Sequence, residues 1–258
     1  MSVPAPIYPD LRNRVLVITG GTKGIGLAVA HLLVANGARV VINGRSPSGT
    51  ESARAELEEA GGEVVCHATD VSHPEGLDSL REATLAAFGR VDGLVAFAGG
   101  FGARTPLVEI DLKEWDTVIR ENLTATFLAV RRFLPDLEAS GRGSIVTMAS
   151  NAGRQLDMPI TASYAAAKAG VVMFTRHAAL ECGSAGVRIN CVAPATVLSP
   201  RVERVMDEQT EALVAGLSPL GTIGVPEDVA GATVFLLSDS ASWMTGVTLD
   251  VAGGRVMQ

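Results

Sequence analysis

A tyrosine and a lysine four positions apart are the residues of this sequence with the clearest chemistry. Tyr164 and Lys168 bound the alanine-rich run YAAAK, and a helix would place them on one face. A free phenol has a pKa of about 10 and transfers protons poorly at neutral pH. A nearby ammonium favours the phenolate and lowers that pKa, which suits proton transfer to or from a substrate oxygen. The pair therefore predicts an acid–base site.

A glycine-rich turn near the N-terminus predicts a phosphate-binding site. Residues 14–19 (RVLVIT) have the length and composition of a strand, and the run TGGTKGIG at 19–26 follows, the start of an expected helix. Glycine lets backbone N–H groups approach an anion, and the helix N-terminus adds partial positive charge. The spacing TGxxxGxG differs from the usual GxGxxG, so a plain tight turn between strand and helix is the alternative.

The end of the second expected strand carries an arginine where an acid is common. An NAD-binding fold usually holds the ribose 2′-hydroxyl there with a carboxylate, whereas this chain reads NGRS at 43–46. The guanidinium of Arg45 can bind a 2′-phosphate bidentately, and Lys23 lies in the glycine loop. Two cations without an acid favour NADP(H) over NAD(H); the alternative is two solvated surface charges. After the third strand, Asp70 either accepts a hydrogen bond from the adenine amino group or caps the coming turn.

Composition excludes several other classes of protein. The 258 residues carry 21 basic and 28 acidic side chains, a net charge of −7, which argues against a nucleic-acid or anionic-membrane partner. With 47% hydrophobic residues the chain is too apolar to be disordered, yet every long apolar stretch is interrupted, so no transmembrane helix is expected. No secretory signal is evident, and three scattered cysteines suggest a reducing compartment, so a cytoplasmic protein is expected. The four histidines lack metal-ligand spacing, and no metal is expected.

Short β-branched runs alternate with longer helical runs along the whole chain. The expected strands are 14–19, 38–43, 63–68, 91–98, 144–148, 187–192 and 247–251. The expected helices are 24–36, 50–60, 74–88, 111–138, 160–182 and 226–238, with room for another in 194–225. This alternation predicts parallel strands joined by right-handed crossovers, with helices on both faces. We expect a single dinucleotide-binding and catalytic domain over residues 1–258, with 1–12 as an N-terminal lead-in.

These features together resemble the short-chain dehydrogenase/reductase family over about residues 10–258. The likeness is carried by TGGTKGIG at 19–26, Asn122 in ENL, Ser150 in MASNAG, YAAAK at 164–168, INCVAP at 189–194 and PEDVAGATVFLLSD at 226–239. The resemblance implies an α/β, Rossmann-like doubly wound sheet of seven parallel strands in the order 3-2-1-4-5-6-7, with helices on both faces. It also implies hydride transfer between a nicotinamide and a carbonyl or secondary alcohol.

The resemblance further assigns roles to individual residues. Tyr164 is the general acid in carbonyl reduction and the general base in alcohol oxidation, while Lys168 lowers its pKa and contacts the nicotinamide ribose. Ser150 donates to the carbonyl oxygen, and Asn122 holds a water that links Lys168 to a proton relay. The expected cofactor contacts are Gly20, Thr22, Lys23, Gly24, Ile25, Gly26, Asn43, Arg45, Ser46, Asp70, Val71, Ala98, Gly99, Tyr164, Lys168, Pro194, Ala195 and Val197.

Some positions depart from the family pattern. Where the family has NNAG after the fourth strand, this chain has AFAG at 96–99, a change of packing more than of chemistry. The family serine usually precedes the tyrosine by 13 positions, the place of Asn151 here. Ser150 precedes Tyr164 by 14, and its MASNAG context favours it. Ser199 stands where a threonine would contact the carboxamide.

The resemblance places the substrate between the loops at 99–106, 151–160 and 195–217. Their apolar side chains suit a medium-sized hydrophobic carbonyl compound and are Phe101, Leu156, Met158, Leu198 and Met206. Arg104 and Arg154 either contact an anion or are solvated charges.

Two substrate classes remain open at this point. The C-terminal part most resembles 3-oxoacyl-[acyl-carrier-protein] reductases, so a 3-oxoacyl thioester is the leading candidate, with Arg131 and Arg132 as carrier-protein contacts. The basic residue that such enzymes use before the sixth strand is replaced by Ser184-Ala185-Gly186. The alternative within the family is a ketone or sugar-alcohol dehydrogenase.

A non-catalytic NADP(H)-binding sensor is the alternative from another class of protein. The presence of all four catalytic residue types weighs against it, because a sensor would not need them. Family members are commonly tetramers built on the two long helices expected at about 111–138 and 160–182. A homotetramer is therefore expected.

Overall fold

The computed structural model describes residues 6–102, 104–155, 160–199, 202 and 206–257. Within them, one parallel sheet contains β1 (Val15–Thr19), β2 (Arg39–Gly44), β3 (Glu63–Ala68), β4 (Gly93–Ala96), β5 (Ser144–Met148), β6 (Arg188–Pro194) and β7 (Thr248–Val251). The strand order is β3-β2-β1-β4-β5-β6-β7. The predicted fold class and strand order are confirmed.

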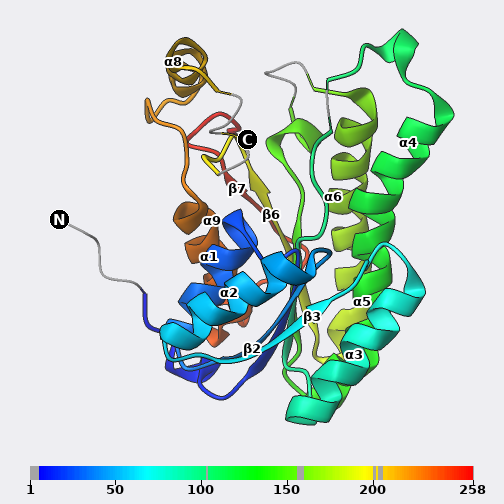
Figure 1. Ribbon diagram of the computed structural model, residues 1–258, viewed down its shortest axis with the longest axis vertical. Coiled ribbons are helices and arrows are strands. Elements are labelled where there is room, and N and C mark those ends of the chain that lie inside the picture. The colour runs from blue at the N-terminus through cyan, green and yellow to red at the C-terminus, as the bar shows by residue number, and fades with distance from the viewer. Residues whose placement is uncertain (1–5, 103, 156–159, 200–201, 203–205, 258) are drawn as a thin grey trace.

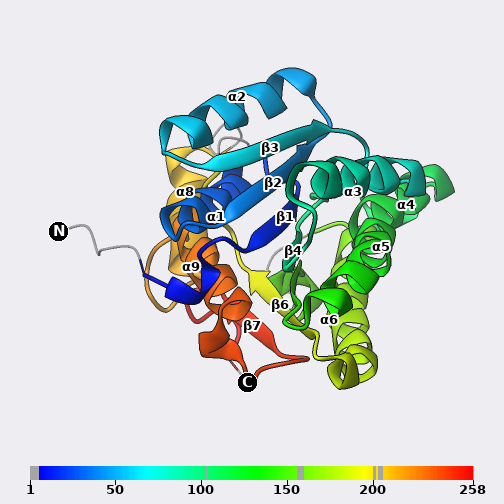
Figure 2. The ribbon, with the colours of Figure 1, turned by 90° about the horizontal axis from the view of Figure 1, so that it is seen from below.

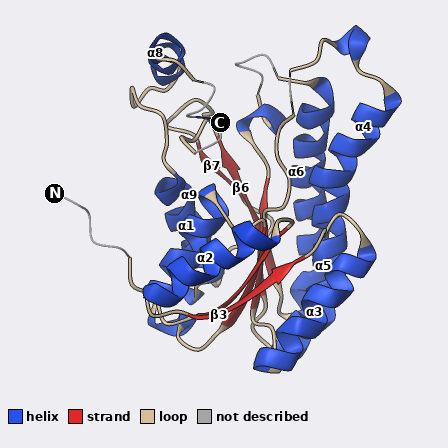
Figure 3. Ribbon diagram, in the orientation of Figure 1, coloured by secondary structure: helices blue, strands red, loops and turns tan. Residues whose placement is uncertain are grey.

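Helices cover both faces of the sheet (Figures 1 and 2). On one face lie α1 (Gly24–Ala35), α2 (Pro47–Glu59) and α9 (Pro226–Leu237). On the other lie α3 (Pro74–Phe88), α5 (Ala125–Ser140) and α6 (Ala162–Cys182). Between β4 and α5 the chain forms α4 (Leu112–Ile119), and between β6 and α9 it forms α8 (Glu208–Gly216). Figure 3 shows the sheet enclosed between these helices.

Two large clusters of the apolar core lie on opposite faces of the sheet, and a smaller third cluster lies between α6 and the ends of β5 and β6. Successive residues of β1 alternate between the two large clusters: Leu16 and Ile18 join the cluster under α1 and α9, whereas Val15 and Val17 join the cluster under α3 and α5. All five residues of β1 are buried. Burial on both faces explains why the strands read as continuous apolar runs, as expected of a parallel sheet. The carboxyl ends of these rigid strands carry the loops that form the site.

The helix expected at 111–138 is interrupted by a wider turn. A five-residue π segment, Arg120–Thr124, separates α4 from α5. The spacing of apolar residues over 111–138 predicts a continuous helix. A π turn adds only one residue to the helical turn, and this pattern of apolar residues does not reveal so small a change. Such turns are frequent at functional sites, and this one contains Asn122. Among the described residues, no helix combines the length and apolar character needed to span a membrane.

Candidate active site

The glycine loop between β1 and α1 forms a cradle suited to an anion. A Cβ on Gly26 would clash with the carbonyl oxygen of Gly20, so the loop packs directly on the start of α1. In the described part of the chain, no side-chain hydrogen bond from the N-cap residue Lys23 closes this helix start. The first N–H groups of a helix and its positive end favour a phosphate. The cradle therefore fits the diphosphate of a nicotinamide dinucleotide.

Other predicted cofactor contacts surround this loop. Thr22 packs against Gly44, where even a Cβ would come within 2.8 Å of the threonine oxygen. The backbone N–H of Ala98 donates to Thr19 Oγ1 at 3.2 Å, which joins the ends of β1 and β4. Ile25 is partly buried and Val71 is buried. Their contacts with a cofactor stay predictions.

The segment after β6 also approaches the glycine loop. Pro194 ends β6, and the N–H of Ala195 donates to the Val251 carbonyl at 3.2 Å. Val197 forms a parallel bridge with Gly224. A Cβ on Gly24 would lie 3.7 Å from the Cβ of Ser199, so the segment after β6 lies next to the glycine loop.

The residues predicted to bind adenosine gather after β2 and β3. Asn43 is buried, and its amide Nδ2 donates to the backbone oxygens of His67 (3.1 Å) and Thr69 (3.0 Å), which ties the two strand ends together. Ser46 is the N-cap of α2, where its hydroxyl accepts from the Gly49 N–H at 3.3 Å. Both side chains therefore have structural roles, and their cofactor contacts stay predictions.

The capping interaction considered for Asp70 is present. Its Oδ1 accepts from the Ser72 N–H at 2.9 Å. Burial alone would raise the pKa of this carboxyl, but hydrogen bonds from Ser72 and the charges of His73 and Arg45 outweigh it and hold the pKa below its usual range. Asp70 is therefore a carboxylate near Arg45, and its contact with adenine stays a prediction.

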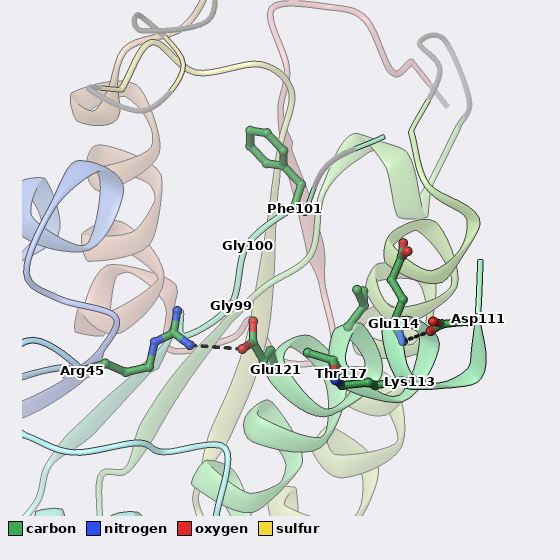
Figure 4. Close-up of a pocket in the computed structure, with 11 residues that line it drawn as sticks. Arg45, Gly99, Gly100, Phe101, Asp111, Lys113, Glu114, Thr117 and Glu121 are labelled. Atoms are coloured by element: carbon green, nitrogen blue, oxygen red, sulfur yellow. Dashed lines mark hydrogen bonds and ion pairs between the residues drawn. The ribbon is translucent and has the colours of Figure 1, made fainter. Parts of the chain in front are cut away.

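Glu121 is a residue of the site that the sequence analysis missed. Its Oε1 lies 3.1 Å from Nη1 of Arg45, and the two side chains point toward one another beside Gly99 (Figure 4). Both residues line a cavity of about 490 Å³ together with residues 99–102 and one side of α4. From the sequence, a single glutamate on an expected helix cannot be distinguished from a solvent-exposed surface charge. Only the tertiary approach of β2 to the π segment reveals this contact.

Tyr164 and Lys168 lie together on α6, at the end of β5. Lys168 Nζ is 5.6 Å from the centroid of the Tyr164 ring, and both residues are buried. The same Nζ donates to the carbonyl oxygen of Met148 at 2.8 Å. Burial lowers the pKa of Lys168 to about 8, an effect that Cys191 partly opposes. The ammonium therefore still predominates at neutral pH, where it can stabilise a phenolate.

Ser150 begins a short turn that packs against α6. It is the N-cap of the 3₁₀ turn Asn151–Gly153, where its Oγ accepts from the Ala152 N–H at 3.2 Å and donates to Asn151 Oδ1 at 3.3 Å. A Cβ on Gly153 would lie 2.5 Å from the carbonyl carbon of Lys168, so this turn lies directly on the backbone that carries the lysine. The turn that Ser150 caps is therefore fixed against α6, and the contact of its hydroxyl with a substrate oxygen stays a prediction.

Asn122 is fully buried and fastens the loop after β4 to the π segment. Its Oδ1 accepts from the Gly100 N–H at 3.0 Å, while Nδ2 donates to the carbonyls of Gly100 (3.1 Å) and Val118 (3.0 Å). Gly99 has φ +135°, and a Cβ there would lie 2.6 Å from Asn122 Oδ1. The asparagine thus shapes the loop beside the acid–base pair, and its link to a proton relay stays a prediction.

The expected substrate side of the site is partly described. The Phe101 ring meets the Tyr164 ring edge to face, with centroids 6.4 Å apart, and provides an apolar wall. Arg154 forms an ion pair with Asp250 at 3.1 Å, whereas Arg104 is exposed. Leu198 and Met206 are half-buried, and the predicted contacts Leu156 and Met158 lie outside the described residues. The described residues hold no group of three or more His, Cys, Asp or Glu arranged for a metal ion.

Comparison with known proteins identifies the family. The family model described as Enoyl-(Acyl carrier protein) reductase matches residues 20–255. The chain is 38% identical over 254 residues to 3beta-hydroxysteroid dehydrogenase 1 of Eggerthella lenta, covering 97% of each chain. It is 36% identical over 249 residues to a 3-oxoacyl-[acyl-carrier-protein] reductase of Synechocystis sp., covering 96% of this chain and 98% of the relative. The crystal structure of levodione reductase superposes with a TM-score of 0.90 at 33% identity, covering 95% of this chain and 98% of that one.

The chain therefore belongs to the short-chain dehydrogenase/reductase family. The resemblance drawn from its motifs is confirmed. Members of this family bind nicotinamide cofactors and act on alcohol or carbonyl groups, and this protein is an oxidoreductase of that kind.

Proposed function

We propose that this protein transfers hydride between NADP(H) and a carbonyl or secondary alcohol, with Tyr164 as the proton-transfer group. The observation that carries the proposal is the buried Lys168 ammonium 5.6 Å from the centre of the Tyr164 ring. Both residues lie at the end of the sheet that also holds the glycine cradle, where ligands of such folds bind.

The proton chemistry follows from the residues at the sheet edge. When bound, the nicotinamide supplies the hydride for reduction or accepts it in oxidation. In reduction the Tyr164 hydroxyl gives its proton to the carbonyl oxygen, and in oxidation the phenolate takes the proton of the alcohol. Lys168 favours the phenolate by its charge, and Ser150 donates a hydrogen bond to the same substrate oxygen. Asn122 holds the loop at Gly99 and Gly100 beside this pair.

The preference for NADP(H) is proposed from the charges near the adenosine end. Arg45 follows β2 at the position where an NAD-binding fold usually has an acid, and its side chain is 70% exposed, so a phosphate can reach it. A guanidinium matches a phosphate with two parallel hydrogen bonds. Lys23, exposed at the N-cap of α1, adds a second cation.

Two substrate classes are candidates, and the structure favours a ring alcohol or ketone over a carrier-bound thioester. Arg132, expected to meet a carrier protein, forms an ion pair with Asp78 across α5 and α3. The aromatic wall of Phe101 beside Tyr164 suits a flat apolar ring. The hydroxysteroid dehydrogenase relative supports the ring compound by its name, and the 3-oxoacyl reductase relative keeps the thioester as the second candidate.

A carbonyl panel with both cofactors tests this proposal. Purified protein is assayed with a 3-oxosteroid, a substituted cyclohexanone and acetoacetyl-coenzyme A, each with NADPH and with NADH. We expect the highest kcat/KM for a ring ketone with NADPH. Highest activity on acetoacetyl-coenzyme A would favour the thioester, and a preference for NADH would contradict the role of Arg45. Tight NADPH binding without turnover of any carbonyl or alcohol would favour the sensor.

A homotetramer is part of the proposal. Large apolar side chains are exposed along α4, α5 and α6: Leu112 (80%), Phe127 (42%), Met173 (61%) and Leu180 (81%). Burying such surface against other copies is favourable. Light scattering at micromolar concentration should give four times the chain mass, whereas a monomer would contradict the assembly.

A further inference from the structure

Arg45 and Glu121 are brought together from two distant parts of the chain. Arg45 Nη1 donates to Glu121 Oε1 at 3.1 Å, across 76 positions of sequence. Arg45 follows β2 at the adenosine end of the proposed cofactor site, and Glu121 lies in the π segment beside Asn122. Figure 4 shows the arginine extended toward the glutamate, with a dashed line joining the two side chains. The guanidinium proposed to bind a phosphate is therefore already paired with an anion.

The Arg45–Glu121 ion pair is weak enough for a phosphate to replace Glu121 as the partner of Arg45. The Arg45 side chain is 70% exposed and that of Glu121 is 37% exposed. Exposed ion pairs are weak and correspond to no more than about a five-fold change in an equilibrium. A phosphate offers the guanidinium two charge-assisted hydrogen bonds and up to two negative charges. Arg45 can therefore leave Glu121 for a phosphate. The free energy lost with the ion pair is offset by the new bonds to the phosphate, which a ligand without that group cannot form.

We propose that Glu121 is a specificity-determining residue that competes with the 2′-phosphate of NADP(H) for Arg45. The inference rests on the proposed preference for NADP(H). With NAD(H) bound, the Arg45–Glu121 pair stays closed, because no 2′-phosphate is present to take the guanidinium. With NADP(H), Arg45 turns from the carboxylate to the phosphate. Glu121 thus reduces the discrimination that Arg45 alone would give.

The surrounding charges strengthen the competition. Asp70 is a second carboxylate near Arg45, since the charge of this arginine helps to lower the Asp70 pKa. The hydrogen bond of Asp70 is to the Ser72 N–H, so this carboxylate acts on Arg45 through its charge alone. Removing the charge of Glu121 frees Arg45 for a phosphate, whereas a ligand without the phosphate gains nothing from the freed guanidinium.

The test measures binding of cofactor fragments to the whole protein by calorimetry. The ligands are adenosine 2′,5′-bisphosphate, which carries the 2′-phosphate, and 5′-AMP, which lacks it. The variants are Glu121→Gln, Arg45→Ala and the double variant. Glu114→Gln is the matched control. Glu114 lines the same cavity, but it lies in the first turn of α4 and not in the π segment that carries Glu121.

We expect Glu121→Gln to tighten the bisphosphate about five-fold, to leave 5′-AMP within about two-fold, and to lose its effect in the Arg45→Ala background. Glu114→Gln should leave the ratio of the two affinities unchanged. Added salt should shrink the gain, since both side chains are exposed.

Two failures are distinguishable. If Arg45→Ala does not weaken the bisphosphate relative to 5′-AMP, the proposed NADP(H) preference is wrong and the inference falls with it. If Arg45→Ala acts as expected but Glu121→Gln changes nothing, or changes both ligands equally, or acts without Arg45, only the role of Glu121 is overturned.

Discussion

The ammonium of Lys168 lies 2.8 Å from the carbonyl oxygen of Met148, the last residue of β5. A backbone carbonyl fixes the position of the cation, but it carries only a partial charge and cannot repay the full cost of burial. The pKa of Lys168 is accordingly lowered to about 8. The fold thus holds a cation at a fixed position next to the Tyr164 ring. The pKa at which this cation loses its proton lies close to neutral pH.

The first prediction concerns the titration of Lys168 in the free protein. We expect its Nζ to titrate at about pH 8, well below the 10.5 of an unburied lysine. Nitrogen chemical shifts of labelled lysine, assigned by comparison with Lys168→Met, would measure this. A Lys168 titration at pH 10 or above would contradict the assigned effect of burial.

The same shift predicts a dependence of stability on pH. Between about pH 8 and 10.5 the unfolded chain binds the Lys168 proton and the folded chain does not, so the free energy of unfolding rises with pH across this window. Below pH 8 the buried ammonium costs the folded state up to about 3 kcal/mol. The stability of wild type relative to Lys168→Met should therefore increase as the pH rises from 8 to 10. A difference independent of pH would contradict the linkage.

The second prediction concerns Gly99. Replacement by alanine forces a side chain into φ +135° and places Cβ 2.6 Å from Asn122 Oδ1. We expect Gly99→Ala to lower the free energy of unfolding by about 1–3 kcal/mol. Gly102→Ala is the matched control in the same loop, since its Cβ would meet no described atom within 4 Å. Equal effects of the two substitutions in urea denaturation would show that Asn122 does not constrain the loop.

A third prediction concerns Asn122 itself. Asn122→Ala leaves the N–H and carbonyl of Gly100 and the carbonyl of Val118 without this fully buried partner. The expected loss of stability is about 2–3 kcal/mol, because unpaired buried polar groups are costly. Asp116→Ala, on the exposed side of α4, should change stability by less than about 0.5 kcal/mol. An Asn122→Ala effect as small as this control would be inconsistent with the three hydrogen bonds.

Sequence reasoning recovered the parts of this molecule that local patterns encode. The β-branched runs, the glycine loop and the spacing of Tyr164 and Lys168 are local patterns, so the strands, the cradle and the pairing on one helix face could be predicted from them. The strand order followed from the family resemblance that these motifs carry. The π segment could not, because no residue type in Arg120–Thr124 distinguishes a π turn from an α-helix. The Arg45–Glu121 pair depends on how two distant elements approach. Such contacts become visible only in three dimensions.

A fourth prediction concerns the ion pair of Arg154 and Asp250. These side chains are 9% and 18% exposed and join the turn after Ser150 to β7. Asp250→Asn should destabilise the protein by about 2 kcal/mol, since it leaves a largely buried guanidinium without its carboxylate. Glu63→Gln breaks the exposed pair with Arg39 and should cost less than about 1 kcal/mol. Similar costs in thermal or urea denaturation would mean that burial does not matter to this contact.

The proton-transfer role of Tyr164 is the central claim, and Tyr164→Phe tests it most directly. Phenylalanine keeps the ring that meets Phe101 and Lys168 but lacks the hydroxyl. Single-turnover stopped-flow measurements with NADPH and the best carbonyl substrate should show the hydride-transfer rate falling by about 10² to 10⁴-fold, with the NADPH dissociation constant nearly unchanged. A Tyr164→Phe variant that turns over at close to the wild-type rate would contradict the mechanism.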